Sequence, residues 1–211
     1  MAEVEIFGPN FSTFVRSVML ACEEKGIPYR QHMEADGVPV GMHSAPHMKL
    51  HPFGKVPVLL HRGQTLCETT AILRYLEALC PDRPLQPSDP WARAQLDQWC
   101  SFVSLYLDQA LIRRYLLEFV FPKGEGGVVR EDRVERALPE VHKMLKFIES
   151  QLDGKSYLLG DELTMVDLLL LPMLDYLLKW PQTQAVAQAY PNIVSYTELL
   201  RQRPSAQKIL V

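Results

Sequence analysis

The sequence predicts an N-terminal α/β domain with the element order β-α-β-α-β-β-α, followed by an all-α helical bundle domain. Strand-like runs alternate with helical apolar faces in the first half of the chain, and no convincing strand occurs in the second half. A segment with a proline at every third position, residues 81–90, separates the two halves. We therefore expect domains at residues 1–80 and 91–211, joined by a linker at 81–90.

The N-terminal half begins with a strand at residues 3–7 and a helix that Gly26 and Pro28 end. A second strand at 29–33 completes a β-α-β unit, which normally gives a parallel pair of strands. A loop or short helix leads to a hairpin at 57–61 and 64–67. The apolar faces of the two helices consist of Val15, Val18, Met19 and Cys22, and of Ile72, Tyr75, Leu76 and Leu79.

The C-terminal half shows only helical periodicity. Residues 91–121 form one long helix or two, an apolar stripe follows at 138–152, and further helices are expected at 164–180 and from Pro191. Thr164 and Asp167 form a capping box, to which we assign a folding role and no catalytic role.

The linker prolines, with their period of three, match one edge of a polyproline II strap. An inter-domain connection is the favoured interpretation, because the character of the chain changes across it. A docking motif for a proline-binding partner is the alternative.

Composition narrows the class of protein. The chain has 211 residues, 47% of them hydrophobic, and a net charge of −3 without a basic stripe, so nucleic acid is not an expected partner. The longest apolar run, residues 168–174, is too short to span a membrane, and the acidic N-terminus does not resemble a signal peptide. The four cysteines lack metal-ligand spacing, so we expect no metal and reduced thiols in the cytoplasm; disulfide and zinc interpretations remain as alternatives.

Two prolines and a glycine precede the short strand at 57–61, in the sequence Pro52-Phe53-Gly54-Lys55-Val56-Pro57. A cis bond between Val56 and Pro57 would turn the Val56 backbone groups outward, where they could pair with an extended peptide ligand. A plain loop with a proline at the strand edge is the alternative.

Other polar residues suit the ends of such a peptide. Thr69, after Glu68, and Ser12 each stand where a strand gives way to a helix, so each is an expected N-cap and a donor near an anion. Lys55 could meet a carboxylate. Plain caps and a solvated lysine are the alternatives, but together these positions suit a peptide with a carboxylate at each end and a reactive group between them.

Four segments together resemble the cytosolic glutathione transferases, most closely the serine-using phi and theta classes and their bacterial relatives. They are FGPNFSTFVRSVMLACEEKGIPY, HSAPHMKLHPFGKVPVLL, TLCETTAILRYL and LLGDELTMVDLLLLPML. The resemblance covers the whole chain. It implies a thioredoxin-like N-terminal domain, glutathione as co-substrate without a metal, a detoxification role and a homodimer.

The resemblance also assigns roles to single residues. Ser12 matches the hydroxyl that contacts the glutathione sulfur, and Val56 matches the residue before the cis proline, Pro57, whose backbone pairs with the cysteinyl unit. Glu68 and Thr69 match the pair that holds the γ-glutamyl end. Lys55 and His43 match side chains near the glycine carboxylate, although phi-like sequences usually have His-Lys where this chain has His43-Ser44.

The implied chemistry is activation of a thiol, with Ser12 as a hydrogen-bond donor to a thiolate that attacks an electrophilic carbon. Candidate walls for the electrophile are Phe11, Tyr106, Ile112 and Leu116, with ordinary core packing as the alternative. A glutathione-dependent oxidoreductase would need a cysteine near Ser12, and none occurs there. A glutathione-dependent peroxidase or isomerase, and a non-catalytic binding module, remain open.

Phe53 lies at the tip of the proline-bounded loop. Exposing such a side chain forgoes roughly 1.5–3 kcal/mol of burial. The resemblance favours its insertion between helices of a second subunit, which makes it a dimer contact. Packing back under its own sheet is the alternative.

Overall fold

The computed structural model describes residues 3–35 and 37–211. The chain folds into two compact units, which we treat separately. The first contains the chain up to Gln86 together with Pro204–Val211, and the second contains Pro87–Arg203. The predicted helical domain extended to residue 211, whereas the last residues pack on the first unit.

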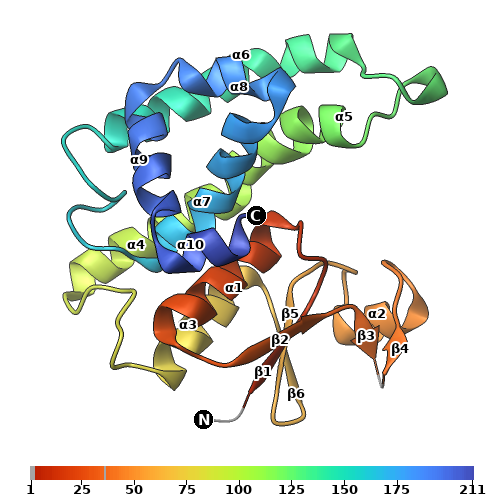
Figure 1. Cartoon of the computed structure of the whole chain (residues 1–211), viewed down its shortest axis with the longest axis vertical. Coiled ribbons are helices and arrows are strands. Elements are labelled where there is room, and N and C mark those ends of the chain that lie inside the picture. The colour runs from red at the N-terminus through yellow and green to blue at the C-terminus, as the bar shows by residue number, and fades with distance from the viewer. Residues whose placement is uncertain (1–2, 36) are drawn as a thin grey trace. The chain divides into compact units, whose positions relative to one another are not determined.

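The first unit contains a four-stranded sheet in the order β2-β1-β5-β6. Its strands are β1 (Val4–Phe7), β2 (Tyr29–His32), β5 (Val58–His61) and β6 (Gln64–Cys67). β1 and β2 are parallel, and the other neighbours are antiparallel (Figure 1). These strands confirm the predicted β-α-β unit and hairpin. A separate two-stranded sheet, β3 (Glu34–Ala35) with β4 (Val38–Pro39), was not predicted.

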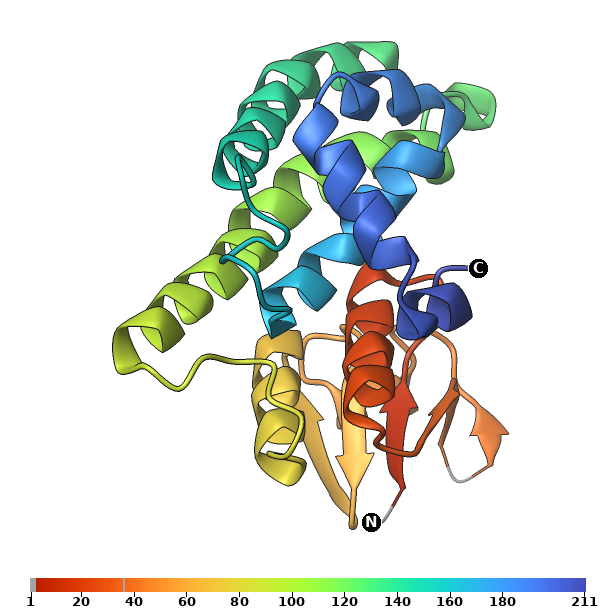
Figure 2. The same cartoon turned by 60° about the vertical axis from the view of Figure 1, so that its left-hand side comes forward.

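Helices α1 (Thr13–Lys25) and α3 (Thr69–Leu79) lie side by side against the sheet (Figure 2). α1 ends at Gly26, which adopts a left-handed φ of 65° and donates its N–H to the last turn. The short helices are α2 (Ala45–Leu50) and α10 (Pro204–Ile209). α10 is attached to α1 through the hydrogen bond from Ser205 to Glu24 (2.5 Å) and the ion pair of Lys208 with Glu23 (2.6 Å).

The second unit is helical. A continuous helical backbone runs through α4 (Pro90–Phe102), the π-helical segment η1 (Val103–Leu116) and α5 (Leu117–Val120). One long helix, the first of the two predicted possibilities, is therefore present. A 3₁₀ turn η2 (Glu125–Gly127) leads to α6 (Glu131–Gln151), and α8 (Pro181–Gln188) and α9 (Pro191–Arg201) complete the unit.

Helix α7 (Met165–Lys179) is buried almost throughout and forms the core of the second unit. The predicted capping box is confirmed, because Asp167 accepts a hydrogen bond from the backbone N–H of Thr164 (2.8 Å). The same carboxylate accepts from the Thr164 hydroxyl, the Leu158 N–H and the Tyr196 hydroxyl, at 2.8–2.9 Å. It thereby joins three segments of the unit.

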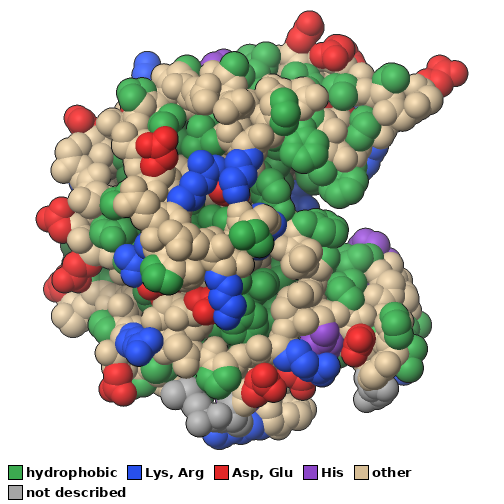
Figure 3. Space-filling model, in the orientation of Figure 1, with side chains coloured by type: hydrophobic (Ala, Val, Ile, Leu, Met, Phe, Trp, Pro, Cys, Tyr) green, Lys and Arg blue, Asp and Glu red, His purple; other side chains and the backbone are tan. Residues whose placement is uncertain are grey.

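The surface carries charged side chains of both signs (Figure 3). On the face drawn in Figure 3, acidic and basic side chains are interspersed without a continuous basic stripe. Among the described residues no helix combines the length and apolar character needed to cross a bilayer. All four cysteines are free, and the described part of the chain holds no cluster of side chains suited to a metal ion.

Candidate active site

One edge of the sheet gathers three of the predicted loops. Phe7, the last residue of β1, pairs with Val58, the first of β5, and Val58 pairs with Cys67, the last of β6. The chain after β1, the chain before β5 and the chain after β6 therefore leave the sheet at the same edge. These three stretches carry Ser12, Val56-Pro57 and Glu68-Thr69, so the topology brings together residues that lie up to 57 positions apart in the sequence.

Ser12 lies at the N-cap of α1, as predicted, with an extended backbone (φ −67°, ψ 128°). Its hydroxyl makes no capping hydrogen bond, and its carbonyl accepts from the Arg16 N–H (2.9 Å). The buried guanidinium of Arg16 donates to the Asn10 carbonyl (2.9 Å) and so supports the loop that leads to Ser12. The hydroxyl is thus held beside a helix N-terminus without serving as its cap.

The Val56–Pro57 bond is cis, as predicted. The bond lies in the loop of residues 52–57, which we call the proline loop. Gly8 lies against this loop and has a φ of 149°. A Cβ atom on Gly8 would lie 3.1 Å from Val56 Cβ and 2.5 Å from Val15 Cγ2, so only glycine fits there. The close approach brings the loop after β1 to the proline loop.

Glu68 and Thr69 differ from the prediction in one respect. α3 begins at Thr69 itself, and Glu68 is the N-cap residue, so Thr69 is not the predicted cap. Glu68 adopts a left-handed φ of 69°, and its side chain is exposed. Thr69 is buried. Because the first N–H groups of a helix have no partner within it, Glu68 and the start of α3 present both a carboxylate and backbone donors.

A fully buried histidine that the sequence patterns missed braces the proline loop. The N–H of His43 donates to Nδ1 of His47 (3.0 Å), so the hydrogen of His47 resides on Nε2, which donates to the Lys55 carbonyl (3.0 Å). The ring also lies 5.2 Å from that of Phe7, between centroids. His47 therefore connects α2, the end of β1 and the residue before Val56.

Lys55, His43 and Phe53 all have exposed side chains. His43 has a left-handed φ of 62°, and a Cβ on Gly54 would lie 2.7 Å from its Nδ1. Phe53 is 72% exposed, so it does not pack under its own sheet.

Two titratable groups beside the loops have shifted pKa values. Burial lowers the pKa of His51, and the nearby Glu68 carboxylate opposes that shift. Burial raises the pKa of the Cys67 thiol, and Glu68 adds to the effect. Both groups therefore favour their neutral forms.

The residues predicted to contact an electrophile fall into two groups. Phe11 and Tyr106 are 55% and 58% exposed, respectively. Ile112 and Leu116 are buried within the second unit, in keeping with the core-packing alternative.

Comparisons with known proteins agree on one family for both halves of the chain. The glutathione S-transferase N-terminal domain model matches residues 11–79, and the C-terminal domain model matches residues 109–204. A probable glutathione S-transferase of Solanum tuberosum is 30% identical over 171 residues, which cover 80% of this chain and 70% of that protein.

Solved structures give the same result. Poplar glutathione transferase F1 is 25% identical, with a TM-score of 0.86, and the match covers 100% of this chain and 97% of that one. Maize glutathione S-transferase I, solved in complex with an atrazine–glutathione conjugate, is 27% identical, with a TM-score of 0.83 and coverage of 99% and 96%.

Proposed function

Because the chain belongs to the glutathione S-transferase family, we propose that Ser12 stabilises the thiolate of bound glutathione for attack on an electrophilic carbon. The Ser12 hydroxyl donates a hydrogen bond to the sulfur, and the thiol proton leaves to solvent. The sulfur then forms a bond to the electrophile, and the leaving group departs with its electron pair. Ser12 is neither a nucleophile nor a base in this scheme.

The observation that carries the proposal is the meeting of three loops at one sheet edge, with a serine hydroxyl that does not cap its own helix. A hydrogen bond to the charged form of a thiol lowers its pKa, and the N-terminus of α1 adds a favourable dipole. A decrease of about two pKa units needs only ~2.7 kcal/mol.

The peptide portion of glutathione is assigned to the same loops. The Val56 backbone pairs with the cysteinyl unit, and Pro57 shapes that loop. Glu68 and Thr69 hold the γ-glutamyl end through a carboxylate and the donors at the start of α3. Lys55 and His43 face the glycine carboxylate. Phe11, exposed on the first unit, and Tyr106, exposed on the second, are separate candidates for contact with an apolar electrophile.

A direct test is conjugation of glutathione to 1-chloro-2,4-dinitrobenzene by the purified protein, together with glutathione titration calorimetry. We expect turnover in the wild type, and a roughly tenfold weaker glutathione affinity in Glu68→Ala, which loses a charged hydrogen-bonding group. Glu162→Ala, a change of an exposed carboxylate in the second unit, serves as the control. Binding without turnover would identify a carrier or binding module. Activity only toward hydroperoxides, or only in a glutathione-dependent isomerisation, would identify the peroxidase or isomerase alternative.

The protein is proposed to act as a cytoplasmic homodimer. Four free thiols agree with a reducing compartment. The exposed ring of Phe53, on the loop that carries Lys55 and Val56, provides an apolar contact for a second copy.

A further inference from the structure

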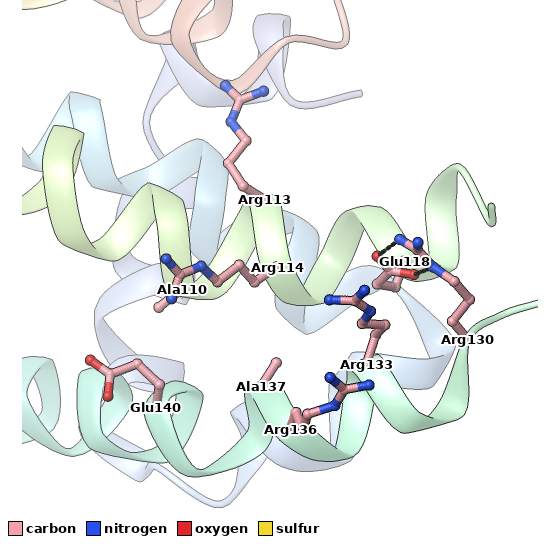
Figure 4. Close-up of a pocket in the computed structure, with 9 residues that line it drawn as sticks. All are labelled: Ala110, Arg113, Arg114, Glu118, Arg130, Arg133, Arg136, Ala137 and Glu140. Carbon is pink, nitrogen blue, oxygen red and sulfur yellow. Dashed lines mark hydrogen bonds and ion pairs between the residues drawn. The ribbon is translucent and has the colours of Figure 1, made fainter. Parts of the chain in front are cut away.

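A second concave site lies within the helical unit, between η1 and α6 (Figure 4). Its volume is about 470 Å³, within the range of small-molecule sites. Ala110 and Ala137 are among its lining residues, and their short side chains leave room between the two helices. The remaining lining residues are all charged: Arg113, Arg114, Glu118, Arg130, Arg133, Arg136 and Glu140.

Three of the five arginines already have carboxylate partners. Arg113 donates to Asp108 through Nε (2.9 Å), and Arg136 pairs with Asp132 on its own helix. Arg130 holds Glu118 with two hydrogen bonds, one of them 2.9 Å from Nε to Oε2, and this pairing lowers the pKa of Glu118. These ion pairs hold three of the lining arginines in place. The charges of the other two lining arginines are not used in these pairs.

Arg114 and Arg133 have no ion pair within residues 3–35 and 37–211, and both are exposed. Arg114 projects from η1 and Arg133 from α6, while Arg113 points away from α6 (Figure 4). Positive charge therefore remains in excess even when Asp108 and Asp132 are counted with the lining carboxylates. Five arginines against these four carboxylates leave one unbalanced positive charge in the pocket, which attracts an anion.

We propose that this pocket binds a small organic molecule with two anionic groups, such as a bisphosphate. Arg114 holds one group from η1, Arg133 holds the other from α6, and the carbon frame lies over Ala110 and Ala137. Guanidinium groups suit this role because their planar forks bind phosphate and carboxylate oxygens with paired hydrogen bonds. The volume of about 470 Å³ suits a small ligand better than an extended polyanion.

The test is isothermal titration calorimetry at low ionic strength, with fructose 1,6-bisphosphate as the probe that carries two anionic groups and fructose 6-phosphate as its matched single-group control. We expect the bisphosphate to bind at least about tenfold more tightly than the monophosphate. Arg114→Gln and Arg133→Gln should each weaken the bisphosphate about tenfold, since each removes a charged hydrogen-bond donor. Lys146→Gln, a change at an exposed position of α6 outside the pocket, should leave binding unchanged.

Equal affinity for the two sugar phosphates would overturn the proposal, as would undetectable binding of the bisphosphate or binding that the Arg114→Gln/Arg133→Gln double variant retains. Tighter binding of a poly-glutamate peptide that the bisphosphate does not displace would also overturn it, because the surface would then be one for acidic proteins. Thermal unfolding of each variant verifies that lost binding does not reflect lost folding.

Discussion

His47 shows how one buried side chain can connect the parts of the candidate site. It accepts from the His43 N–H and donates to the Lys55 carbonyl, and it is inaccessible to solvent. Both ring nitrogens are therefore engaged with backbone groups near the residues assigned to glutathione. His47 is a positioning residue, because it acts on the ligand only through the loop before Val56.

His47→Phe should keep a ring of similar size and remove both hydrogen bonds. We expect the KM for glutathione to rise roughly tenfold, because two backbone groups lose their partners and the proline loop shifts. kcat should change much less, since Ser12 lies on a different loop. Steady-state kinetics with glutathione as the varied substrate measures both constants.

Lys49→Gln, an exposed change on the same helix, is the matched control for His47→Phe and should behave as the wild type. A folded His47→Phe protein with an unaltered KM would show that His47 only fills space.

The residues assigned to the candidate site are easier to find in the sequence than the residues that position them. Ser12, Val56-Pro57 and Glu68 are recognisable because each lies at a strand–helix or loop–strand junction. His47 lies in a six-residue helix without periodicity, and its two partners are backbone atoms, which leave no pattern in the sequence. Thr69 is not the N-cap that the sequence predicts, because α3 begins at Thr69 and Glu68 is the N-cap residue. The left-handed backbone of Glu68 leaves no pattern in the sequence.

At the scale of elements, the alternation of strand-like and helical segments and the helical periodicity predict the four strands of the main sheet and the long helices. They miss β3 and β4, which have two residues each, and the short helices α8 and α10. They also give no sign of the π-helical hydrogen bonding in η1, because the helix remains continuous and its buried face is preserved. Short elements depend on tertiary contacts rather than on a repeating pattern.

Loss of the capping box of α7 should lower the stability of the protein substantially. Asp167 is fully buried and accepts four hydrogen bonds from the Leu158, Thr164 and Tyr196 groups. Asp167→Ala would leave these donors buried without an acceptor. We expect the free energy of unfolding to fall by roughly 3 kcal/mol, as measured by urea denaturation.

The neighbouring Asp161→Ala provides the comparison for Asp167→Ala. Asp161 is exposed, so its loss should change stability by no more than about 0.5 kcal/mol. Similar losses in both variants would show that the buried network does not stabilise the unit.

At the scale of the whole molecule, we predict a dimer in which Phe53 is buried. Light scattering at micromolar concentration should give about twice the chain mass of 24.1 kDa. Phe53→Ser should shift the protein toward monomer and weaken glutathione binding in parallel, because the same loop carries Lys55 and Val56. Val38→Ser, at another exposed apolar position of the first unit, should do neither.

A fully active wild-type monomer would refute the proposed assembly. A Phe53→Ser dimer as tight as the parent would refute the role of Phe53 alone.

The central claim is that Ser12 lowers the pKa of the glutathione thiol, and ultraviolet titration of the thiolate in the bound complex measures that pKa directly. In the wild type it should lie about two units below that of free glutathione, a difference worth ~2.7 kcal/mol. Ser12→Ala should still bind glutathione, with the pKa returned most of the way to the free value and turnover reduced accordingly. The same low pKa in wild type and Ser12→Ala, with equal turnover, would contradict the account.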